Sequence, residues 1–440
     1  MATATAEKKD RSKLIPFSSR LKEGRALAQD RSESASRLHQ FGPGIYELSP
    51  PAWVTEAAEE ALRTVAPNHY SHPKGRIRLR EAIKKFYGPQ LGRELDVESE
   101  ILVTSGANEG QYSVFTAFLE QGDEVIMFEP FFDQYLPSVT FNGGKPVYVP
   151  LHPPAHDISK PTSDDWTIDI AELRKSLHKE GTRGIAAVAE EFNLLVMSDE
   201  VVRICLFTQH SIGHSSKDLQ YDCLVFDGKE HVRIANLPGM WDRTVTVCSA
   251  GKAFAATGWR VGWLIGPASI IQPTLAATTR IVFCTNSPLQ EAAASGLEQA
   301  KERQYFEIQR AEYAERRKIL ADVFDQLGLK YTLPEGSYFI LLDISNVKFP
   351  DDYPFPESVL GRGRDFRACW FIAMEIGVSS IPVSEVCFNL LPHEPLRTHS
   401  QFYCEEHANI GEAYARFAFC KDVDTLGKAA ERLKNLKNYM

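Results

Sequence analysis

The sequence lacks an excess of positive charge, because 58 Asp and Glu side chains outnumber 49 Lys and Arg side chains and the formal net charge is −9. A surface for nucleic acid or for anionic lipid needs the opposite sign. We therefore expect neither a nucleic acid nor a membrane as a partner. No uninterrupted apolar run approaches the ~18 residues that span a bilayer, and the first ten residues lack the apolar stretch of a secretory signal.

The eight cysteines are scattered, and neither a C-x-x-C pair nor an N-glycosylation sequon is present. This spacing argues against a structural zinc cluster, so no metal site is expected, and isolated cysteines are typical of a reducing compartment. We predict a cytoplasmic enzyme. Lys8, Lys9 and Arg11 near the start leave a mitochondrial protein as the alternative, although Glu7 and Asp10 disfavour a transit peptide.

With 440 residues, of which 43% are hydrophobic, the chain is long enough to bury a large core. Its middle alternates helical patterns with short apolar runs, at 101–104, 124–128, 145–149, 194–198, 244–248 and 260–264. This alternation predicts an α/β fold with a mostly parallel sheet covered by helices on both faces. We predict three parts: a partly disordered N-terminal segment, 1–50, that completes the small domain, a large domain, 51–305, and a small α+β domain, 306–440.

The segment 245–263, VTVCSAGKAFAATGWRVGW, is the most informative for chemistry. An apolar strand leads to Ser249, Lys252 follows three residues later, and Arg260 comes eight residues after the lysine. A lysine held in a pocket at a strand end can act as a Schiff-base nucleophile, and the hydroxyl and guanidinium groups are donors for a phosphate. Taken alone, the lysine is more simply explained as an ordinary surface residue.

Asp199 ends a second apolar run, and ligands of open α/β sheets bind at the carboxyl ends of strands. A carboxylate there can keep the pyridine nitrogen of a cofactor protonated, while a helix cap or a salt bridge is the simpler alternative. The run 103–110, VTSGANEG, leads from a strand into a helix, whose first backbone N–H groups attract anions. It is neither a Walker loop nor a G-x-G-x-x-G motif, so this signal is weak by itself.

Two further residues stand out from an apolar background. Phe132 lies in the segment 129–135, EPFFDQY, where an aromatic face could stack on a ring, although ordinary core packing explains it slightly better. Arg416 lies among the apolar residues of a predicted strand, in the segment 415–419, ARFAF. An arginine in such a place usually pairs with a carboxylate, either of the protein or of a substrate.

Together and in this order, these motifs resemble the class I, or fold-type I, pyridoxal-phosphate aminotransferases. Within them the sequence looks most like the group of kynurenine aminotransferases, glutamine transaminase K and cysteine-S-conjugate β-lyases. The resemblance runs from Pro51 to the C-terminus and is most specific at 68–75, 103–110, 129–135, 198–201, 249–263 and 285–290. It implies a large three-layer αβα domain that binds the cofactor and a smaller α+β domain.

The resemblance also implies roles for individual residues. Lys252 would bind pyridoxal 5′-phosphate covalently and carry a proton during the reaction. Asp199 would pair with the nitrogen of the cofactor ring, and Phe132 would stack on that ring. The cofactor phosphate would be bound by the turn at the start of a helix and by two side chains after the lysine-bearing strand: Gly106, Ala107, Asn108, Ser249 and Arg260.

Tyr70 would reach the cofactor phosphate of a neighbouring subunit, which implies a homodimer, and Arg416 would bind the α-carboxylate of the substrate. The family also has a tyrosine shortly after the aspartate, which contacts the 3′-oxygen of the cofactor. Here the residues 202–220 are inserted after the aspartate strand, and Tyr221 is the displaced counterpart of that tyrosine.

Two other departures concern segments that the family has and this chain lacks. No Asn-Pro occurs anywhere, so the family's Asn-Pro-x-Asn-Pro segment is absent, which indicates a missing strand and loop before Asp199. The family's Gly-rich substrate loop is replaced by Arg31–Ile45. The resemblance predicts a transaminase that moves an amino group from a kynurenine-like, glutamine-like or aromatic L-amino acid to a 2-oxo acid. A cysteine-S-conjugate β-lyase and a catalytically impaired paralogue are the alternatives.

Overall fold

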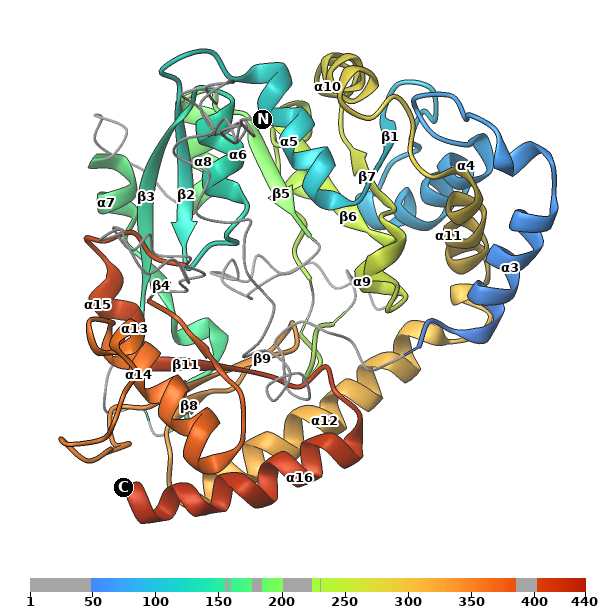
Figure 1. Ribbon diagram of the computed structural model, residues 1–440. Coiled ribbons are helices and arrows are strands. Elements are labelled where there is room, and N and C mark those ends of the chain that lie inside the picture. The colour runs from blue at the N-terminus through green and yellow to red at the C-terminus, as the bar shows by residue number, and fades with distance from the viewer. Residues whose placement is uncertain are drawn as a thin grey trace, which may run out of the picture.

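The computed structural model describes residues 49–154, 158, 160–175, 184–200, 224–229, 231–384 and 402–440. The N-terminal segment up to residue 48, with Arg31–Ile45, the inserted residues 202–220 and Tyr221 lie outside these ranges. Among the helices of the described part, none combines the length and the apolar character needed to cross a membrane. Figure 1 shows the described elements in the order of the chain.

Two helices open the described part, α3 (Ala52–Arg63) and α4 (Ile77–Tyr87), and both pack against α11 (Ser287–Ala300). In α3 the buried residues Val54, Ala58 and Ala61 recur every three or four positions, so one face of the helix is covered. The facing side of α11 is rich in alanine, and small side chains let the helix axes approach closely. These helices form one outer layer of the fold.

A four-stranded sheet in the order β1-β7-β6-β5 forms the centre. Its strands are β1 (Ile101–Thr104), β5 (Val196–Asp199), β6 (Thr244–Ser249) and β7 (Gly262–Ile265). Alternate residues face opposite layers: Leu102 and Leu264 pack on the side of α5 (Ala107–Phe118) and α10 (Ala268–Ile281), whereas Val103 and Trp263 pack on the side of α4 and α11. The predicted three-layer αβα arrangement is therefore present.

A second sheet has the order β2-β3-β4, with β2 (Glu124–Glu129), β3 (Lys145–His152) and β4 (Thr167–Ile168). The helices of this part are α6 (Tyr135–Phe141), α7 (Ile170–Lys175) and α8 (Gly184–Glu191). Within the described ranges β2 and β5 are not paired, so the large sheet is divided at the place where the absence of the Asn-Pro segment indicates a missing strand.

The strand directions are mixed. The pairs β2·β3 and β5·β6 are parallel, as expected from the alternation of strands and helices, but β7 runs antiparallel to both β1 and β6, and β4 runs antiparallel to β3. The connection from β6 to β7 contains only α9 (Ala250–Ala253) and one 3-10 turn. So short a connection is typical of antiparallel neighbours, because a parallel return needs a longer crossover.

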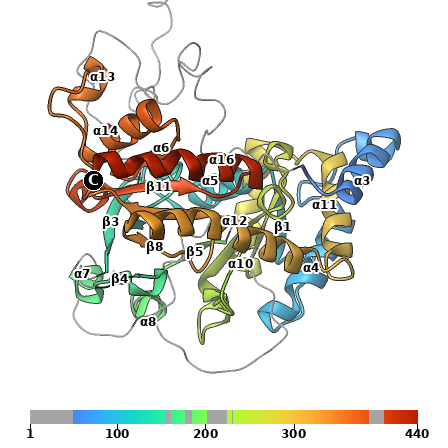
Figure 2. The same ribbon diagram turned by 90° about the horizontal axis from the view of Figure 1, so that it is seen from below.

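The C-terminal part has a four-stranded antiparallel sheet in the order β10-β11-β9-β8. The strands are β8 (Tyr331–Thr332), β9 (Phe339–Asp343), β10 (Ile381–Pro382) and β11 (Tyr414–Ala418). The helices are α12 (Tyr305–Leu327), α13 (Glu357–Leu360), α14 (Arg364–Phe371), α15 (Ala408–Gly411) and α16 (Val423–Leu433). Figures 1 and 2 both show α12 and α16 side by side, and Figure 1 shows them below this sheet.

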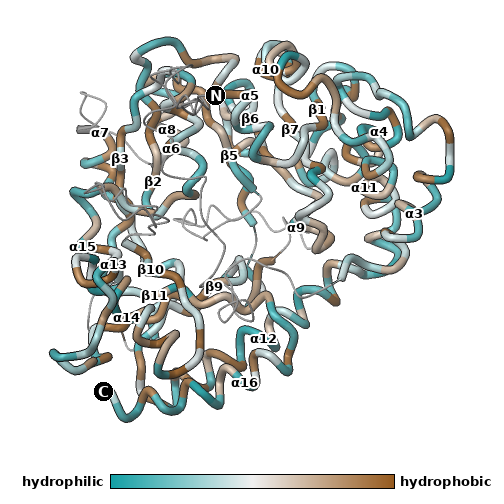
Figure 3. The backbone as a smooth tube through the Cα atoms, in the orientation of Figure 1, coloured by the Kyte–Doolittle hydropathy of each residue, from teal (hydrophilic) through white to brown (hydrophobic). Residues whose placement is uncertain are grey.

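The core of the C-terminal part lies between that sheet and the two long helices. Phe417 of β11 and Ile340 of β9 pack there against Phe324 of α12 and Leu426 of α16. Figure 3 shows teal and brown segments alternating along α12 and α16, as expected for helices with one buried face. Because the side chains of a strand alternate, Arg416 lies on the opposite face of β11 from Phe417.

Candidate active site

The register of the central sheet brings the predicted phosphate site together. Thr104 at the end of β1 pairs with Gly262, and Gly262 pairs with Ser249 at the end of β6. A Cβ atom on Gly262 would lie 2.8 Å from the backbone nitrogen of Ala107, so this position has room only for glycine. Ser249 therefore lies in the same row of the sheet as the turn that leads into α5.

Gly106 and Arg260 lie against each other in this turn. Gly106 has a φ of 81° and precedes α5 as its N-cap, without a side chain that caps the first N–H groups of the helix. A Cβ atom there would lie 2.5 Å from Nη2 of Arg260, whose Nη1 donates a hydrogen bond to the carbonyl of Thr257 at 3.1 Å. Backbone N–H groups of Ala107 and Asn108, a hydroxyl and a guanidinium thus form a donor set for a phosphate.

Lys252 lies on the short helix α9, directly after β6, as the sequence predicts for a lysine delivered by an apolar strand. Its Nζ donates a hydrogen bond to Oη of Tyr338 at 2.9 Å. Tyr338 is buried, precedes β9 and belongs to the C-terminal part. Sequence reasoning missed this tyrosine, because it lies 86 residues from the lysine and its local sequence carries no functional signal.

Asp199 ends β5 and pairs with Val247 of β6, two residues before Ser249. Its Oδ2 accepts hydrogen bonds from Nε2 of Gln111 at 2.6 Å and from Oη of Tyr135 at 2.5 Å. Burial and the charge of Asp199 raise the pKa of Tyr135 well above its ordinary value, so the phenol stays a donor. These two donors hold the carboxylate in one orientation.

Gln111 was not predicted, although it lies in α5 one turn after Asn108, where a polar residue on the buried face could have been noticed. Gln111 is only 1% exposed. A glutamine is rarely buried so completely unless it has a hydrogen-bond partner, and here that partner is Asp199. Tyr135 belonged to the predicted aromatic motif, but its bond to Asp199, 64 residues away, could not be read from that motif.

Phe132, Tyr135, Asp199 and Arg416 line one cleft of about 750 Å³ between β2 and β5. Phe132 keeps 38% of its surface exposed and meets Tyr135 edge to face, with 5.8 Å between the ring centroids. A ring that is not covered by the protein leaves a face for an aromatic ligand. The structure thus brings three of the predicted ring and substrate residues to one place.

Arg416 lies between the rings of Phe339 and Phe402, with its guanidinium carbon 4.3 Å from each centroid. Burial lowers the pKa of Arg416 to about 10. Its Nε is buried without a hydrogen-bond partner, and no carboxylate of the described part forms an ion pair with it; Asp133 acts on it only through its charge. A buried cation without an anion is costly, so this arginine is suited to bind the carboxylate of a ligand.

Tyr70 does not join the other site residues within its own chain. Its side chain is 86% exposed and meets the exposed Phe283 edge to face, with 5.4 Å between the ring centroids. Tyr221, the remaining predicted cofactor residue, lies outside the described residues. The site as described therefore consists of the phosphate donors, Lys252 with its tyrosine, Asp199 with its donors, and the cleft of Arg416.

These residues fit pyridoxal 5′-phosphate. The turn before α5 has no side chain at Gly106, and this is where a phosphate dianion would receive backbone donors. A carboxylate with two hydrogen-bond donors is suited to face a protonated ring nitrogen. When bound, the cofactor supplies the electron sink for chemistry at the Cα atom of an amino acid.

A three-layer αβα scaffold whose lysine follows a central strand, with a cleft toward a smaller α+β part, is the architecture of the fold-type I pyridoxal-phosphate enzymes. Residues 38–360 match the aminotransferases of class I and II. The chain belongs to this family, and it is a pyridoxal-phosphate-dependent transaminase that transfers an amino group to a 2-oxo acid.

Curated relatives cover nearly the whole chain. A probable kynurenine–oxoglutarate transaminase of Saccharomyces cerevisiae is 38% identical over 442 residues, which cover 95% of this chain and 91% of that relative. A kynurenine–oxoglutarate transaminase of Dictyostelium discoideum is 34% identical over 90% of both chains. The crystal structure of Bna3p from Saccharomyces cerevisiae superposes with a TM-score of 0.82 and 36% identity, over 97% of this chain and 100% of that one.

Proposed function

We propose that the amino donor of this transaminase is kynurenine or another L-amino acid with an aromatic or glutamine-like side chain. The observation that carries the proposal is Arg416, whose buried guanidinium forms no ion pair with a carboxylate of the described residues and lies against two aromatic rings. The cation suits the α-carboxylate of the donor, and the aromatic residues that line the same cleft offer apolar surface for its side chain. The names of the two curated relatives support the same donor class.

In this proposal each residue acts on one part of the reaction. Nζ of Lys252 would take the proton from Cα of the donor and hold it, and Oη of Tyr338 would keep the amine in place meanwhile. Asp199, oriented by Gln111 and Tyr135, would keep the nitrogen of the cofactor ring protonated and therefore positively charged. The donors around Gly106 anchor the phosphate end, so that the reacting atoms stay within reach of the lysine.

One observation favours a second candidate, a catalytically impaired paralogue. In the described part, β5 is paired with β6 on one edge, and its other edge faces the cleft instead of a neighbouring strand. Asp199 ends this strand, so weaker support for β5 translates into weaker support for the ring of the cofactor. A chain of this kind binds the cofactor poorly and turns over slowly.

The donor proposal is tested with the purified full-length chain and added pyridoxal phosphate. We expect product from kynurenine or phenylalanine only when 2-oxoglutarate or another 2-oxo acid is present. Aspartate, whose side chain carries a second carboxylate, serves as the contrasting donor and should react at least about tenfold more slowly, since its charge is poorly matched to aromatic faces.

Three other results would contradict this proposal. Release of pyruvate and ammonia from a cysteine S-conjugate without any 2-oxo acid, at a rate above that of amino transfer, would identify a carbon–sulfur lyase. A protein that stays colourless and never takes up added cofactor would identify the impaired paralogue. Equal rates with aspartate and kynurenine would leave the transaminase but reject the aromatic donor class.

We also propose that the chain acts as a homodimer in which Tyr70 serves the site of the partner subunit. Tyr70 and Phe283 form an exposed aromatic pair, and exposed aromatic residues that contact each other are frequent at interfaces. We expect Tyr70→Ala to weaken cofactor binding by about tenfold, the effect of losing one hydrogen bond to a charged group.

Mixing two impaired variants tests whether the site is shared between the two subunits of the dimer. Lys252→Ala chains and Tyr70→Ala chains are each impaired alone, but a mixed dimer contains one site that has both the lysine and the tyrosine. Refolding the two variants together should therefore restore activity well above either variant alone. A mixture that is no more active than its components, or a monomeric mass by sedimentation, would reject a shared site.

A further inference from the structure

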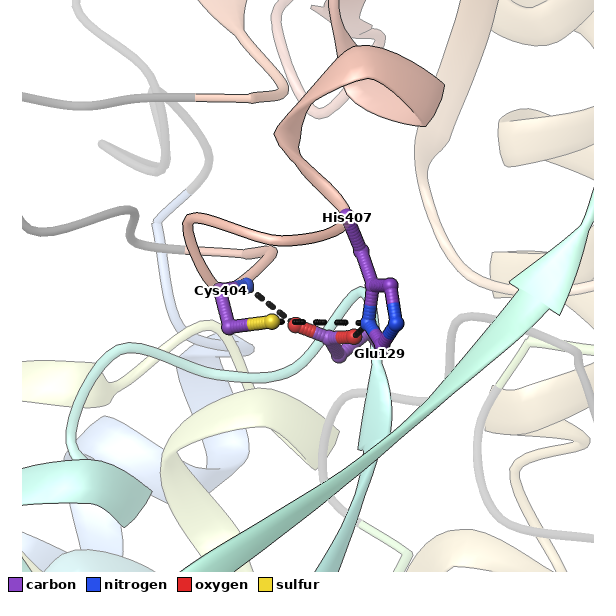
Figure 4. A group of neighbouring side chains, drawn as sticks. All are labelled: Glu129, Cys404 and His407. Carbon is purple, nitrogen blue, oxygen red and sulfur yellow. Dashed lines mark hydrogen bonds and ion pairs between the residues drawn. The ribbon is translucent and has the colours of Figure 1, made fainter. Parts of the chain in front are cut away.

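Glu129, Cys404 and His407 form a cluster outside the residues used above (Figure 4). Glu129 is the last residue of β2, whereas Cys404 and His407 lie directly before α15 in the C-terminal part. A backbone hydrogen bond from Phe131 to the carbonyl of Phe402, at 3.0 Å, fastens these two segments together beside the cluster. The three side chains thus meet where the sheet β2-β3-β4 contacts the C-terminal part.

The ligand atoms of the cluster converge. Sγ of Cys404, Nδ1 of His407 and a carboxylate oxygen of Glu129 all lie within 4.8 Å of one another. Sγ lies 3.4 Å from Nδ1, and Oε2 of Glu129 contacts the same Nδ1. The other carboxylate oxygen accepts a hydrogen bond from the backbone nitrogen of Cys404. Glu129 is fully buried, so its carboxylate is fixed by these contacts.

This geometry differs from that of a catalytic Cys-His-Glu triad. In a triad the nucleophile and the acid use different nitrogens of the imidazole, so that the ring can relay a proton between them. Here the thiol and the carboxylate face one and the same nitrogen, Nδ1. Three different ligand atoms around one point are the arrangement that a metal ion requires.

We propose that Glu129, Cys404 and His407 bind a Zn²⁺ ion. One thiolate, one imidazole and one carboxylate are ligands that Zn²⁺ accepts together, whereas Mg²⁺ and Ca²⁺ prefer oxygen alone. Three protein ligands leave the fourth tetrahedral position to water. The C-x-x-H spacing of Cys404 and His407 gives a short loop with two ligands, and Glu129 adds the third from β2.

The ion would join two parts of the chain that are far apart in sequence. Glu129 and Cys404 are separated by 275 residues, which explains why the spacing of cysteines gave no sign of a metal site. Glu129 also lies three residues before Phe132, so a metal here would fix the start of the segment that presents this ring to the cleft. The site is independent of the donor that the transaminase uses.

The test uses the full-length protein with its cofactor, first stripped of metal by a chelator. Zn²⁺ is then titrated by calorimetry and Co²⁺ by absorbance, since Co²⁺ bound to a thiolate gives a charge-transfer band. We expect one ion per chain and a Co²⁺ band from Cys404. Cys404→Ser should lose the band and weaken Zn²⁺ binding by more than about 100-fold, because even residues that only support metal ligands account for 10–100-fold.

The chain offers a matched control in Cys284, a half-buried free cysteine between α10 and α11. Cys284→Ser should keep both the stoichiometry and the Co²⁺ band. His407→Asn, read out in the same way, gives a second loss if Cys404→Ser does not fold. The proposal is overturned if the wild-type chain takes up no Zn²⁺, if Cys404→Ser keeps the Co²⁺ band, or if Cys284→Ser loses it.

Discussion

Replacing Lys252 by alanine abolishes amino transfer, with an expected fall in kcat of about 10⁴-fold or more. A positioned group that moves a proton contributes up to about 10⁴-fold by itself, and the resemblance to the family implies that this lysine also binds the cofactor covalently. Among the described residues, Nζ of Lys252 is the amine that follows the central strand β6 and meets Tyr338 beside the phosphate turn.

Two measurements distinguish this loss from a general defect. Steady-state rates report the fall in kcat, and mass spectrometry after borohydride reduction reports whether the cofactor is covalently retained. Wild-type protein should retain one cofactor per chain, and Lys252→Ala should retain none. Lys301→Ala, which removes an exposed lysine at the end of α11, is the matched control and should behave like the wild type.

Tyr338→Phe separates the hydrogen bond from the lysine itself. This variant keeps the buried ring but loses the Oη atom that lies 2.9 Å from Nζ. We expect covalent attachment of the cofactor to persist while kcat falls by roughly tenfold, the effect of one hydrogen bond to a charged group. If Lys252→Ala kept more than a tenth of the wild-type rate, the lysine would not be the proton carrier.

The strand that delivers Lys252 could be predicted because its signal is local. An apolar run predicted a strand over 244–248, and β6 spans Thr244–Ser249 with all but the last residue buried. The strand predicted over 260–264 begins two residues later, at Gly262. Arg260 adopts a left-handed conformation with a φ of 54°, which no strand residue can have, and this turn aims its guanidinium at Gly106.

Contacts between distant segments could not be predicted in the same way. Gln111 meets Asp199 across 88 residues, and Tyr338 meets Lys252 across 86, so neither pair leaves a local pattern. The absence of an Asn-Pro segment predicted a missing strand, and within the described residues β2 and β5 are indeed not paired with each other. The cleft between β2 and β5 lies at that division.

Arg416 stood out in the sequence because it is a charged residue within an apolar strand. The alternation of side chains along a strand then determines which face of the sheet Arg416 lies on. Ala415 and Phe417 are buried toward the helices, so the residue between them must face the other way. What the sequence could not supply is the pair of rings around it. Phe339 comes from the neighbouring strand β9 and Phe402 from the segment that follows the undescribed residues 385–401.

Replacing Arg416 by glutamine raises the KM for the amino donor by about 100-fold, while kcat changes less. Loss of one partner of a buried charge pair costs about 2–5 kcal/mol, or a factor of roughly 30 to several thousand. Glutamine keeps a hydrogen-bond donor on a shorter side chain and removes the charge that would face the α-carboxylate. Amines that lack the α-carboxylate gain nothing from this charge, so their weak turnover should be the same in both proteins.

The same side chain sets a pH limit for donor binding. Burial lowers the pKa of Arg416 to about 10, and only the charged form attracts a carboxylate. The KM should therefore stay low below pH 9 and rise as the pH passes through about 10, and Arg416→Gln should lack this rise. Arg303→Gln, in the exposed turn after α11, is the control with the same change of charge. A KM within twofold of the wild-type value in Arg416→Gln would show that the carboxylate is bound elsewhere.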